Sequence, residues 1–291
     1  MQNKFLITCV VTLTMFLASC GDNSEANSVI PTDETITLTD DIHAPTYVGA
    51  ERNFSSSFDL ESDFDGFYIV PQGDYDTNHT LSTDEINDTT FAHKAWILQA
   101  RDIDNESTPT YLPHRGYPTV QLDKTADGIY RKSLVSLMVY LDMNLTARAG
   151  IDDWFSFITL SPDSSDSWSR TVLVNVAPDG YARLVHVPNQ GEQTYIYQEE
   201  NNISMKFPFR QWVRFDVYID FDETNGYAKV WQDGVLVSHA NVNGGLGGLA
   251  QAHFGMYAAA AVEAGTIYND KLRIQEVADE AAAQDLVDAA Y

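Results

Sequence analysis

Apolar and polar residues alternate along much of this chain, most regularly in "WVRFDVYIDF" at Trp212 to Phe221. Every second residue from position 213 onward is apolar, whereas Arg214, Asp216 and Asp220 fall between them. Side chains of a strand point alternately to opposite faces of a sheet. The segment is therefore predicted to be a half-buried β-strand.

The other strand-like segments are short and are separated by turn residues. Asp233-Gly234 divides the run from Gly226 to His239 and predicts a β-hairpin. Further strands are predicted at Ala92 to Ala100, Thr119 to Lys124, Leu134 to Asp142, Trp154 to Leu160, Thr171 to Val176, Tyr181 to Val187, Thr194 to Gln198 and Thr266 to Gln275. One acidic helix is predicted at Ala278 to Ala290. Many short strands with one short C-terminal helix predict an all-β, two-sheet jelly-roll sandwich.

The N-terminus has the pattern of a secretory signal. Lys4 precedes an apolar run from Phe5 to Leu17, which is about as long as a signal-peptide core and short for a membrane span. "LASC", which ends at Cys20, resembles the lipobox of bacterial lipoproteins, in which the cysteine is lipidated. The alternative is a buried strand that ends in a free cysteine. The resemblance implies a signal peptide at 1–19 and attachment to the bacterial cell envelope through lipid on Cys20, with the outer membrane favoured over the inner.

Composition constrains the rest of the chain. Residues 20–50 are polar and acidic and predict a tether, so residues 51–291 would form one domain, which we expect to be a monomer. The cysteines are Cys9 and Cys20, so the mature protein would hold no disulfide and no thiolate zinc site. The formal net charge of -25 weighs against nucleic-acid binding, and an anionic polymer would require a local basic patch.

Two polar strand faces are candidates for a sugar site. In "HRGYPTVQL", alternation places Arg115, Tyr117, Thr119 and Gln121 on one face and His114 with the core residues on the other. These hydrogen-bonding side chains would suit a sugar-binding cleft, although a solvated outer face has the same pattern.

"QAHFGMY" at Gln251 to Tyr257 repeats this ambiguity. As a strand it places His253, Gly255 and Tyr257 on one face and Phe254 with Met256 on the other. The polar face is either a catalytic surface or the wet side of a sheet.

A predicted hairpin within Arg170 to Val187 supplies two further candidates. The valines of "TVLVNV" form a core stripe that leaves Asn175 on the other face. His186 shares a face with Leu184, so the pattern allows either a core or a cleft position, and a structural histidine is the simpler interpretation.

The order of these segments resembles the jelly-roll, concanavalin A-like polysaccharide lyases, which include alginate, glucuronan and heparin lyases. In the alginate lyases an early strand carries an arginine, a middle strand Gln-Ile-His, and a late strand Lys-Ala-Gly-x-Tyr. This chain has Arg115 early, Asn175 and His186 in the middle, and Gly255 with Tyr257 late. The usual glutamate and the Gln-Ile-His motif are absent from the corresponding segments.

The resemblance implies β-elimination from a polysaccharide that contains uronic acid. That reaction needs a neutralised C6 carboxylate, a base for the C5 proton and an acid for the leaving O4. Arg115, Gln121 and Asn175 would hold the carboxylate. Tyr257 would be the acid, or both acid and base beside a cation, with His186 or His253 as the alternative base, and Gly255 would leave room for a sugar ring. No catalytic cofactor is implied.

Other residues extend this hypothesis. Arg170, Arg183 and Lys229 would contribute with Arg115 to the basic patch. Stacking platforms for sugar rings are expected among Tyr181, Tyr227 and Trp231, although core packing is the simpler interpretation for each aromatic residue. Tyr117 and His114 are expected as further substrate ligands.

Acidic residues suggest two alternatives. Glu61, Asp63 and Asp270 would lie together if the first and last strands pair, and would form either a structural calcium site or a solvated turn. A glycoside hydrolase needs two opposed carboxylates, and the nearest pattern, "ESDFD" at Glu61 to Asp65, is incomplete. We therefore expect a polysaccharide lyase, with a non-catalytic glycan-binding lipoprotein or a hydrolase of the same fold as alternatives.

Overall fold

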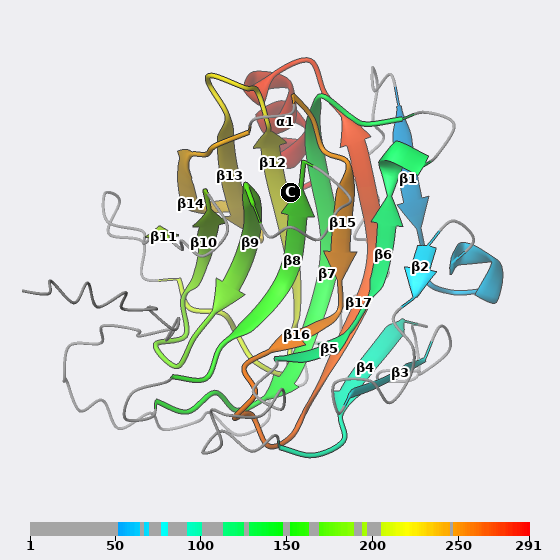
Figure 1. Ribbon diagram of the computed structural model, residues 1–291, viewed down its shortest axis with the longest axis vertical. Helices are drawn as coiled ribbons and strands as arrows, with labels where there is room; N and C mark the ends of the chain where they lie inside the picture. Colours follow the sequence, from blue (N-terminus) through cyan, green and yellow to red (C-terminus); the bar gives the residue numbers. More distant parts are fainter. Residues whose placement is uncertain are drawn as a thin grey trace, which may run out of the picture.

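The computed structural model describes a sandwich of two antiparallel sheets (Figure 1). The described residues are 52–64, 67–69, 77–80, 92–100, 113–124, 128–147, 152–162, 169–188, 194–196, 205–244 and 247–291. The predicted signal peptide, Cys20 and the tether lie outside these ranges. In the described part of the chain, no helix is both long enough and apolar enough to cross a membrane.

Sheet A has the strand order β14-β13-β12-β7-β17-β4-β3, with β1 paired to β17. Its strands are β1 (Asn53–Ser56), β3 (Thr77–Thr80), β4 (His93–Ile97), β7 (Lys132–Met143), β12 (Trp212–Asp220), β13 (Tyr227–Gln232), β14 (Val235–Asn241) and β17 (Gly265–Glu276). The first and last strands pair as expected, with Phe54 opposite Ile274.

Sheet B has the order β11-β10-β9-β8-β15-β6-β2, and β16 joins it between β5 and β8. Its strands are β2 (Phe67–Ile69), β5 (His114–Gly116), β6 (Pro118–Gln121), β8 (Phe155–Ser161), β9 (Thr171–Val176), β10 (Ala182–Val187), β11 (Thr194–Ile196), β15 (Gln251–Phe254) and β16 (Met256–Ala258). The predicted two-sheet sandwich is confirmed.

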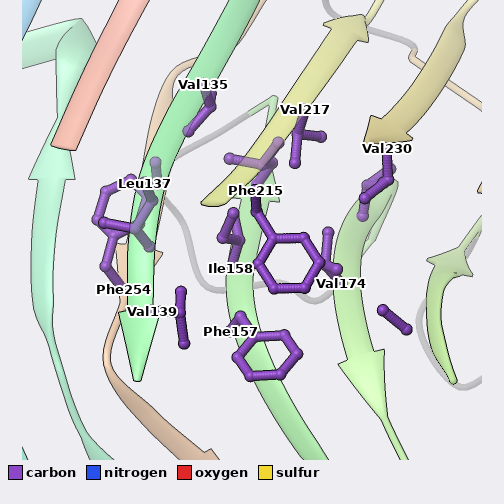
Figure 2. Packing of buried hydrophobic residues seen from close by; sticks show 14 of the residues in the cluster. Val135, Leu137, Val139, Phe157, Ile158, Val174, Phe215, Val217, Val230 and Phe254 are labelled. Atoms are coloured by element: carbon purple, nitrogen blue, oxygen red, sulfur yellow. The ribbon is translucent and has the colours of Figure 1, made fainter. Parts of the chain in front are cut away.

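The core lies between the sheets and uses the predicted alternation. Val213, Phe215 and Val217 of β12 point inward and are fully buried, as are the alternate residues of β7. Figure 2 shows Phe215 beside Phe157, whose ring centroids are 4.9 Å apart, and Phe254 beside Leu137. The side chains between these inward residues therefore project from the outer faces.

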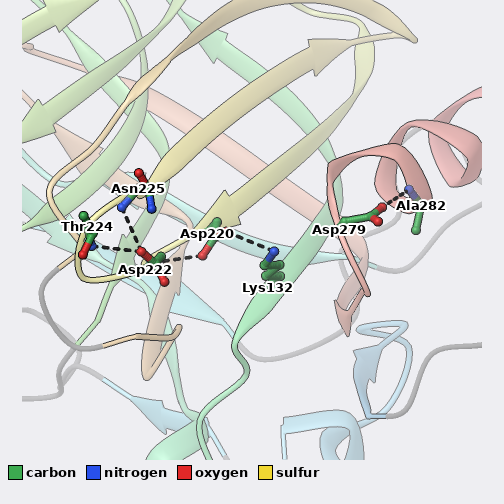
Figure 3. A network of polar contacts seen from close by, with 7 residues as sticks. All are labelled: Lys132, Asp220, Asp222, Thr224, Asn225, Asp279 and Ala282. Atoms are coloured by element: carbon green, nitrogen blue, oxygen red, sulfur yellow. Dashed lines mark hydrogen bonds and ion pairs between the residues drawn. The ribbon is translucent and has the colours of Figure 1, made fainter.

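Turns fix the strand ends around the β12–β13 hairpin (Figure 3). The Asp222 carboxylate accepts hydrogen bonds from the backbone N–H groups of Thr224 and Asn225, while Lys132 forms an ion pair with Asp220 at 3.5 Å. These acidic side chains replace missing backbone partners, as short polar residues commonly do in turns.

Helix α1 (Glu280–Asp288) covers part of the outer face of sheet A. Asp279 caps it by accepting from the Ala282 N–H at 2.9 Å, as Figure 3 shows. Ala283 and Val287 pack on Trp231, which is only 1% exposed. The predicted helix is confirmed, with slightly shorter bounds.

Short elements were the ones that the sequence pattern missed. β1, β2 and β3 have three or four residues each, too few to show a period. The expected strand at Gln251 to Tyr257 is interrupted at Gly255, whose φ of 115° separates β15 from β16. Phe254 and Met256 nevertheless both enter the core.

Candidate functional site

The outer face of sheet B brings together the two polar segments singled out in the sequence. β16 pairs with β5 so that Tyr257 lies directly opposite Arg115. β15 pairs with β6, which places His253 opposite Thr119. Five residues on this face, Arg115, Tyr117, Trp154, His253 and Tyr257, form a contiguous group that we term the Tyr257 cluster.

Arg115 and Tyr257 are in direct contact. The guanidinium carbon lies 5.6 Å from the phenol ring centroid, and Arg115 also donates a hydrogen bond to the Tyr257 hydroxyl. Burial raises the pKa of Tyr257, and the Arg115 charge and hydrogen bond oppose this shift without cancelling it. Tyr257 therefore keeps its proton at neutral pH, as a proton donor must.

Aromatic rings hold Tyr257 and His253 in place. The Tyr117 ring stacks on the His253 imidazole with centroids 4.6 Å apart and meets Tyr257 edge-on at 6.4 Å. Trp154, which precedes β8, meets Tyr257 edge-on with the ring centroids 4.9 Å apart. Such contacts restrict rotamers and keep both rings at fixed positions on the sheet.

A chain of polar side chains leads to His253. The Lys124 ammonium donates to Gln121 Oε1 at 2.7 Å, Gln121 Nε2 donates to Gln251 Oε1 at 3.1 Å, and Gln251 Nε2 lies 2.5 Å from His253 Nε2. Lysine can only donate, so the direction of every bond in the chain is fixed. His253 Nε2 is thus the acceptor, which assigns a neutral imidazole with its proton on Nδ1.

Asn175 and Arg183 extend the site across sheet B. Ala258 pairs with Phe155, so Tyr257 faces Ser156, which in turn faces Asn175 and then Arg183. Two strand spacings place Asn175 about 10 Å from Tyr257. Its Oδ1 is buried and has no hydrogen-bond partner among the described residues.

An apolar wall lines the cluster. Leu173, Val185 and Val187 project from the same face of β9 and β10, are at most 5% exposed, and pack with Tyr257. This wall lowers the local dielectric and so strengthens charge interactions of Arg115 with any anion bound there.

Gly255 has a backbone role that differs from the expected one. A Cβ at this residue would lie 2.9 Å from His93 Cε1 and 3.0 Å from the Gly116 carbonyl oxygen. The space that glycine leaves therefore lies toward His93, and the positive φ allows His253 and Tyr257 to share a face across the interruption.

Two predicted histidines lie apart from the cluster. His114 is fully buried, and its Nε2 lies 3.1 Å and 3.0 Å from the carbonyl oxygens of Ala260 and Val262. His186 points to the same side of β10 as core residue Leu184. Its Nδ1 donates to the Thr171 carbonyl and its Nε2 accepts from the Asn243 N–H. Both are structural, which corrects their assignment as sugar ligand and base.

Other predicted platforms belong to sheet A. Trp231 is buried beneath α1, and Lys229 forms an ion pair with Glu280 of that helix. Tyr227 is hydrogen-bonded to His239 at 2.9 Å on the same sheet. Tyr227 packs against the same helix-docking cluster as Trp231. Trp231, Tyr227 and Lys229 are therefore corrected from sugar contacts to residues that surround the docked helix.

Arg183 and Arg170 remain on sheet B or its edge. Arg183 is 4% exposed, forms an ion pair with Asp179, and donates to the Tyr181 carbonyl at 3.3 Å. Arg170 directly precedes β9 and has a φ of 64°. Arg115 and Arg183 are thus the two arginines in the line of cross-strand neighbours that runs from β5 through β16, β8 and β9 to β10.

Asp63 and Asp270 of the predicted calcium site lie among the described residues. There, no group of three or more histidine, cysteine or acidic residues has suitable geometry. Asp63 accepts hydrogen bonds from Ser57, Asp59 and Leu60, which lower its pKa despite opposing burial. Burial raises the pKa of Asp270 to about 7, and the Glu61 side chain lies outside the described residues.

Comparisons with known proteins add general likenesses. No protein family and no curated protein matches the sequence. Among solved structures, the botulinum neurotoxin type G receptor binding domain superposes with a TM-score of 0.45 at 9% identity over 83% of this chain and 51% of its own. Domain 4 of AbnA, a GH43 extracellular arabinanase from Geobacillus stearothermophilus solved with arabinotriose, gives 0.43 at 17% identity over 81% and 96%.

The chain spans about half the length of the neurotoxin domain. A second neurotoxin domain, type DC with rat synaptotagmin II, has a TM-score of 0.45 at 12% identity over 77% of this chain and 47% of its own. Likenesses at these scores carry no argument for this chain.

Three site residues escaped the sequence analysis. Gln251 lies two residues before His253 and so shares its strand face, a signal that period-two counting contains. Trp154 and Ser156 reach the cluster through the pairing of β8 with β16, which no local pattern reveals. The assembled site offers a fixed cation, a protonated phenol and a neutral imidazole.

Proposed function

We propose that the protein is a polysaccharide lyase that cleaves a uronate-containing polysaccharide by β-elimination on the outer face of sheet B. The contact between Arg115 and Tyr257 supports this proposal most directly, because it joins a carboxylate-binding cation to a proton donor. No aspartate or glutamate belongs to the described Tyr257 cluster, whereas glycoside hydrolysis commonly needs two carboxylates.

In the proposed reaction Arg115 pairs with the C6 carboxylate and acidifies the C5 proton. His253, kept neutral by the chain from Lys124, accepts that proton on Nε2, and the Gln251 amide gives up its hydrogen bond to this atom as it does so. The electron pair of the C5–H bond forms the C4=C5 double bond as the C4–O4 bond breaks. Tyr257 donates its proton to O4, so the products are an unsaturated uronate and a new reducing end.

Neighbouring residues would orient the sugar chain. The amide of Asn175, a residue that is 9% exposed, would hydrogen-bond a sugar hydroxyl, and Arg183, its cross-strand neighbour, would attract a second carboxylate. Gln121 acts through Gln251 on His253, so its proposed role moves from carboxylate ligand to positioning residue. With Cys20 as lipid anchor, the enzyme would work at the bacterial envelope, with the outer membrane favoured over the inner.

A glycan-binding protein without catalysis is the second candidate. The stacked Tyr117 and His253 rings and the edge-on Trp154 favour it, because aromatic rings bind sugars without any proton transfer. In that case the same face would retain a polysaccharide and leave it intact.

One assay separates these functions. The domain from residue 51 is incubated with alginate, glucuronan, ulvan and heparin, and absorbance of the unsaturated uronate is followed together with reducing ends. Growth of both signals supports the lyase. Reducing ends alone would indicate a hydrolase, and binding with neither signal would indicate the glycan-binding protein.

A further inference from the structure

The outer face of sheet A carries a second organised set of aromatic side chains. Trp212, Tyr140, Tyr268 and Lys94 occupy directly paired positions on β12, β7, β17 and β4. Their neighbours in sequence enter the core, so all four side chains project outward. We term this set the aromatic row. Three strand spacings give it a length of about 14 Å.

The rings of the aromatic row are braced against one another. Tyr140 meets Trp212 and Tyr268 edge-on, with centroid distances of 5.8 Å in both pairs. The Lys94 ammonium lies 5.5 Å from the Tyr268 centroid and 5.4 Å from that of Trp96. All of these side chains are half-buried, so each keeps part of its surface toward solvent. Little side-chain entropy would be lost when a ligand stacks on them.

A second line of side chains adds hydrogen-bonding groups beside the aromatic row. Asp142, Thr266, Trp96 and Asn78 are paired across β7, β17, β4 and β3 in the next outward positions. Arg210 binds Asp142 at 2.8 Å and Asn144 at 3.2 Å at one end of this line. Donors and acceptors thus border the aromatic rings along their length.

This combination has the chemistry of a surface for a sugar chain. Sugar rings present apolar C–H faces to aromatic rings and hydroxyl groups to polar neighbours. Local charge also differs from that of the whole protein. Lys94 and Arg210 outnumber Asp142 here, although the chain has a formal net charge of -25. An anionic polymer would therefore meet cationic groups among these side chains.

We propose that the aromatic row is a second, non-cleaving binding surface for the uronate-containing polysaccharide. The inference rests on the proposed function for the identity of the polymer. The two surfaces lie on opposite outer faces of the sandwich, so one polymer chain held on sheet A leaves the Tyr257 cluster open to another stretch or another chain. The row raises the local concentration of substrate and contributes no catalytic group.

The test compares two double variants of the domain by electrophoresis in gels that contain alginate, glucuronan, ulvan or heparin. Trp212→Ala with Tyr268→Ala removes two stacking rings and should weaken retention roughly tenfold. Trp212→Phe with Tyr268→Phe keeps the rings and should retain most binding. Tyr227→Ala, another half-buried tyrosine on sheet A, is the matched control and should leave retention unchanged.

Lyase rates on short oligosaccharides report the fold of each variant and should stay at the wild-type level. If no polymer yields unsaturated product but retention still depends on Trp212 and Tyr268, the lyase proposal fails and the binding surface stands. Product formation with unchanged retention in the alanine variant would overturn the binding surface alone. A further gel contains hydroxyethylcellulose, a polymer without carboxylates. Retention in this gel but in none of the uronate gels would also contradict the inference.

Discussion

The two outer faces of the sandwich use aromatic residues in different ways. On sheet B, Tyr257 and His253 are fixed by Arg115, Tyr117 and a directed chain of amides. Burial keeps the Tyr257 phenol protonated, and the chain of amides assigns the neutral form of His253. On sheet A, Trp212, Tyr140 and Tyr268 contact mainly one another, with Lys94 at the end. A surface for proton transfer needs titratable groups under restraint, whereas a surface for stacking needs only rings.

The faces also differ in how much of each is covered by regular structure. Helix α1 occupies the outer face of sheet A above Leu134, Tyr218 and Trp231, and the Tyr291 ring lies beside Arg214 at 5.4 Å. These contacts cover the part of sheet A near β13. The aromatic row lies toward the other end of strands β12 and β7. An aromatic residue on the outer face of a sheet is thus available to a ligand only where no other element of the fold covers it.

The largest effect is expected for Arg115. Arg115→Ala should lower kcat/KM about a thousandfold, because the substrate carboxylate then lacks its cation and the C5 proton stays weakly acidic. Initial rates of unsaturated-product formation measure this. Arg273→Ala, at a half-exposed arginine of sheet A bonded to Asn53, should keep wild-type rates. Equal rates in the two variants would place the reaction away from the cluster.

A second prediction concerns the base. Gln251→Glu replaces a donor to His253 Nε2 by a carboxylate, which raises the pKa of the imidazole and favours its protonated form. Because the protonated ring cannot accept a proton, the acidic limb of the pH–rate profile should move to higher pH, with rates near pH 6 reduced roughly tenfold. Gln251→Asn is the uncharged comparison. An unshifted limb in the glutamate variant would remove His253 as the base.

A third, smaller effect is expected on the stability of the fold, at Asp270 of sheet A. Burial raises the pKa of Asp270 to about 7, so the folded protein binds this proton more tightly than the unfolded chain does. Stability contributed by this proton is therefore present at low pH and lost as the pH rises from about 4 to about 7. Asp270→Asn should raise the free energy of unfolding at pH 8 by an amount that grows by about 1.4 kcal/mol per unit of pKa difference.

Urea denaturation at pH 4 and pH 8 checks this prediction, with lyase rates as the second reading. The gain should nearly vanish at pH 4, and product formation should not change. His93 has the opposite sign, since burial lowers its pKa to about 3 and its stabilising effect is lost as the pH falls below about 6.5. Loss of activity in Asp270→Asn would show that a residue of sheet A takes part in catalysis. It would contradict the assignment of catalysis to sheet B and binding to sheet A.

Sequence periodicity predicted the sandwich well because long strands bury one face. The stripe of Val213, Phe215 and Val217 is an example, and so is the shared face of His253 and Tyr257. Strands of three or four residues, such as β2, carry too few positions to show a period. The break at Gly255 was invisible because glycine fits a straight strand as readily as a positive φ.

The sequence predicted the position of a site residue where the alternation of side chains along a strand determines it. The prediction failed where packing against other elements determines the position. Arg115 and Tyr257 come from segments 142 residues apart, and the pairing of β16 with β5 places them opposite one another, on one sheet. His186 was ambiguous because its strand is buried on both faces, and only the bonds to Thr171 and Asn243 decide its side. Trp231 was misassigned because α1, which buries it, begins at Glu280, 49 residues later in the chain.

The central claim is that Tyr257 donates the proton to the leaving O4, and Tyr257→Phe tests it most directly. The phenylalanine keeps the ring that Arg115, Tyr117 and Trp154 contact and removes only the hydroxyl. On the polymer that the wild-type protein cleaves, kcat should fall about a hundredfold or more while retention in a gel of that polymer stays within about twofold. Full kcat in Tyr257→Phe would contradict this role.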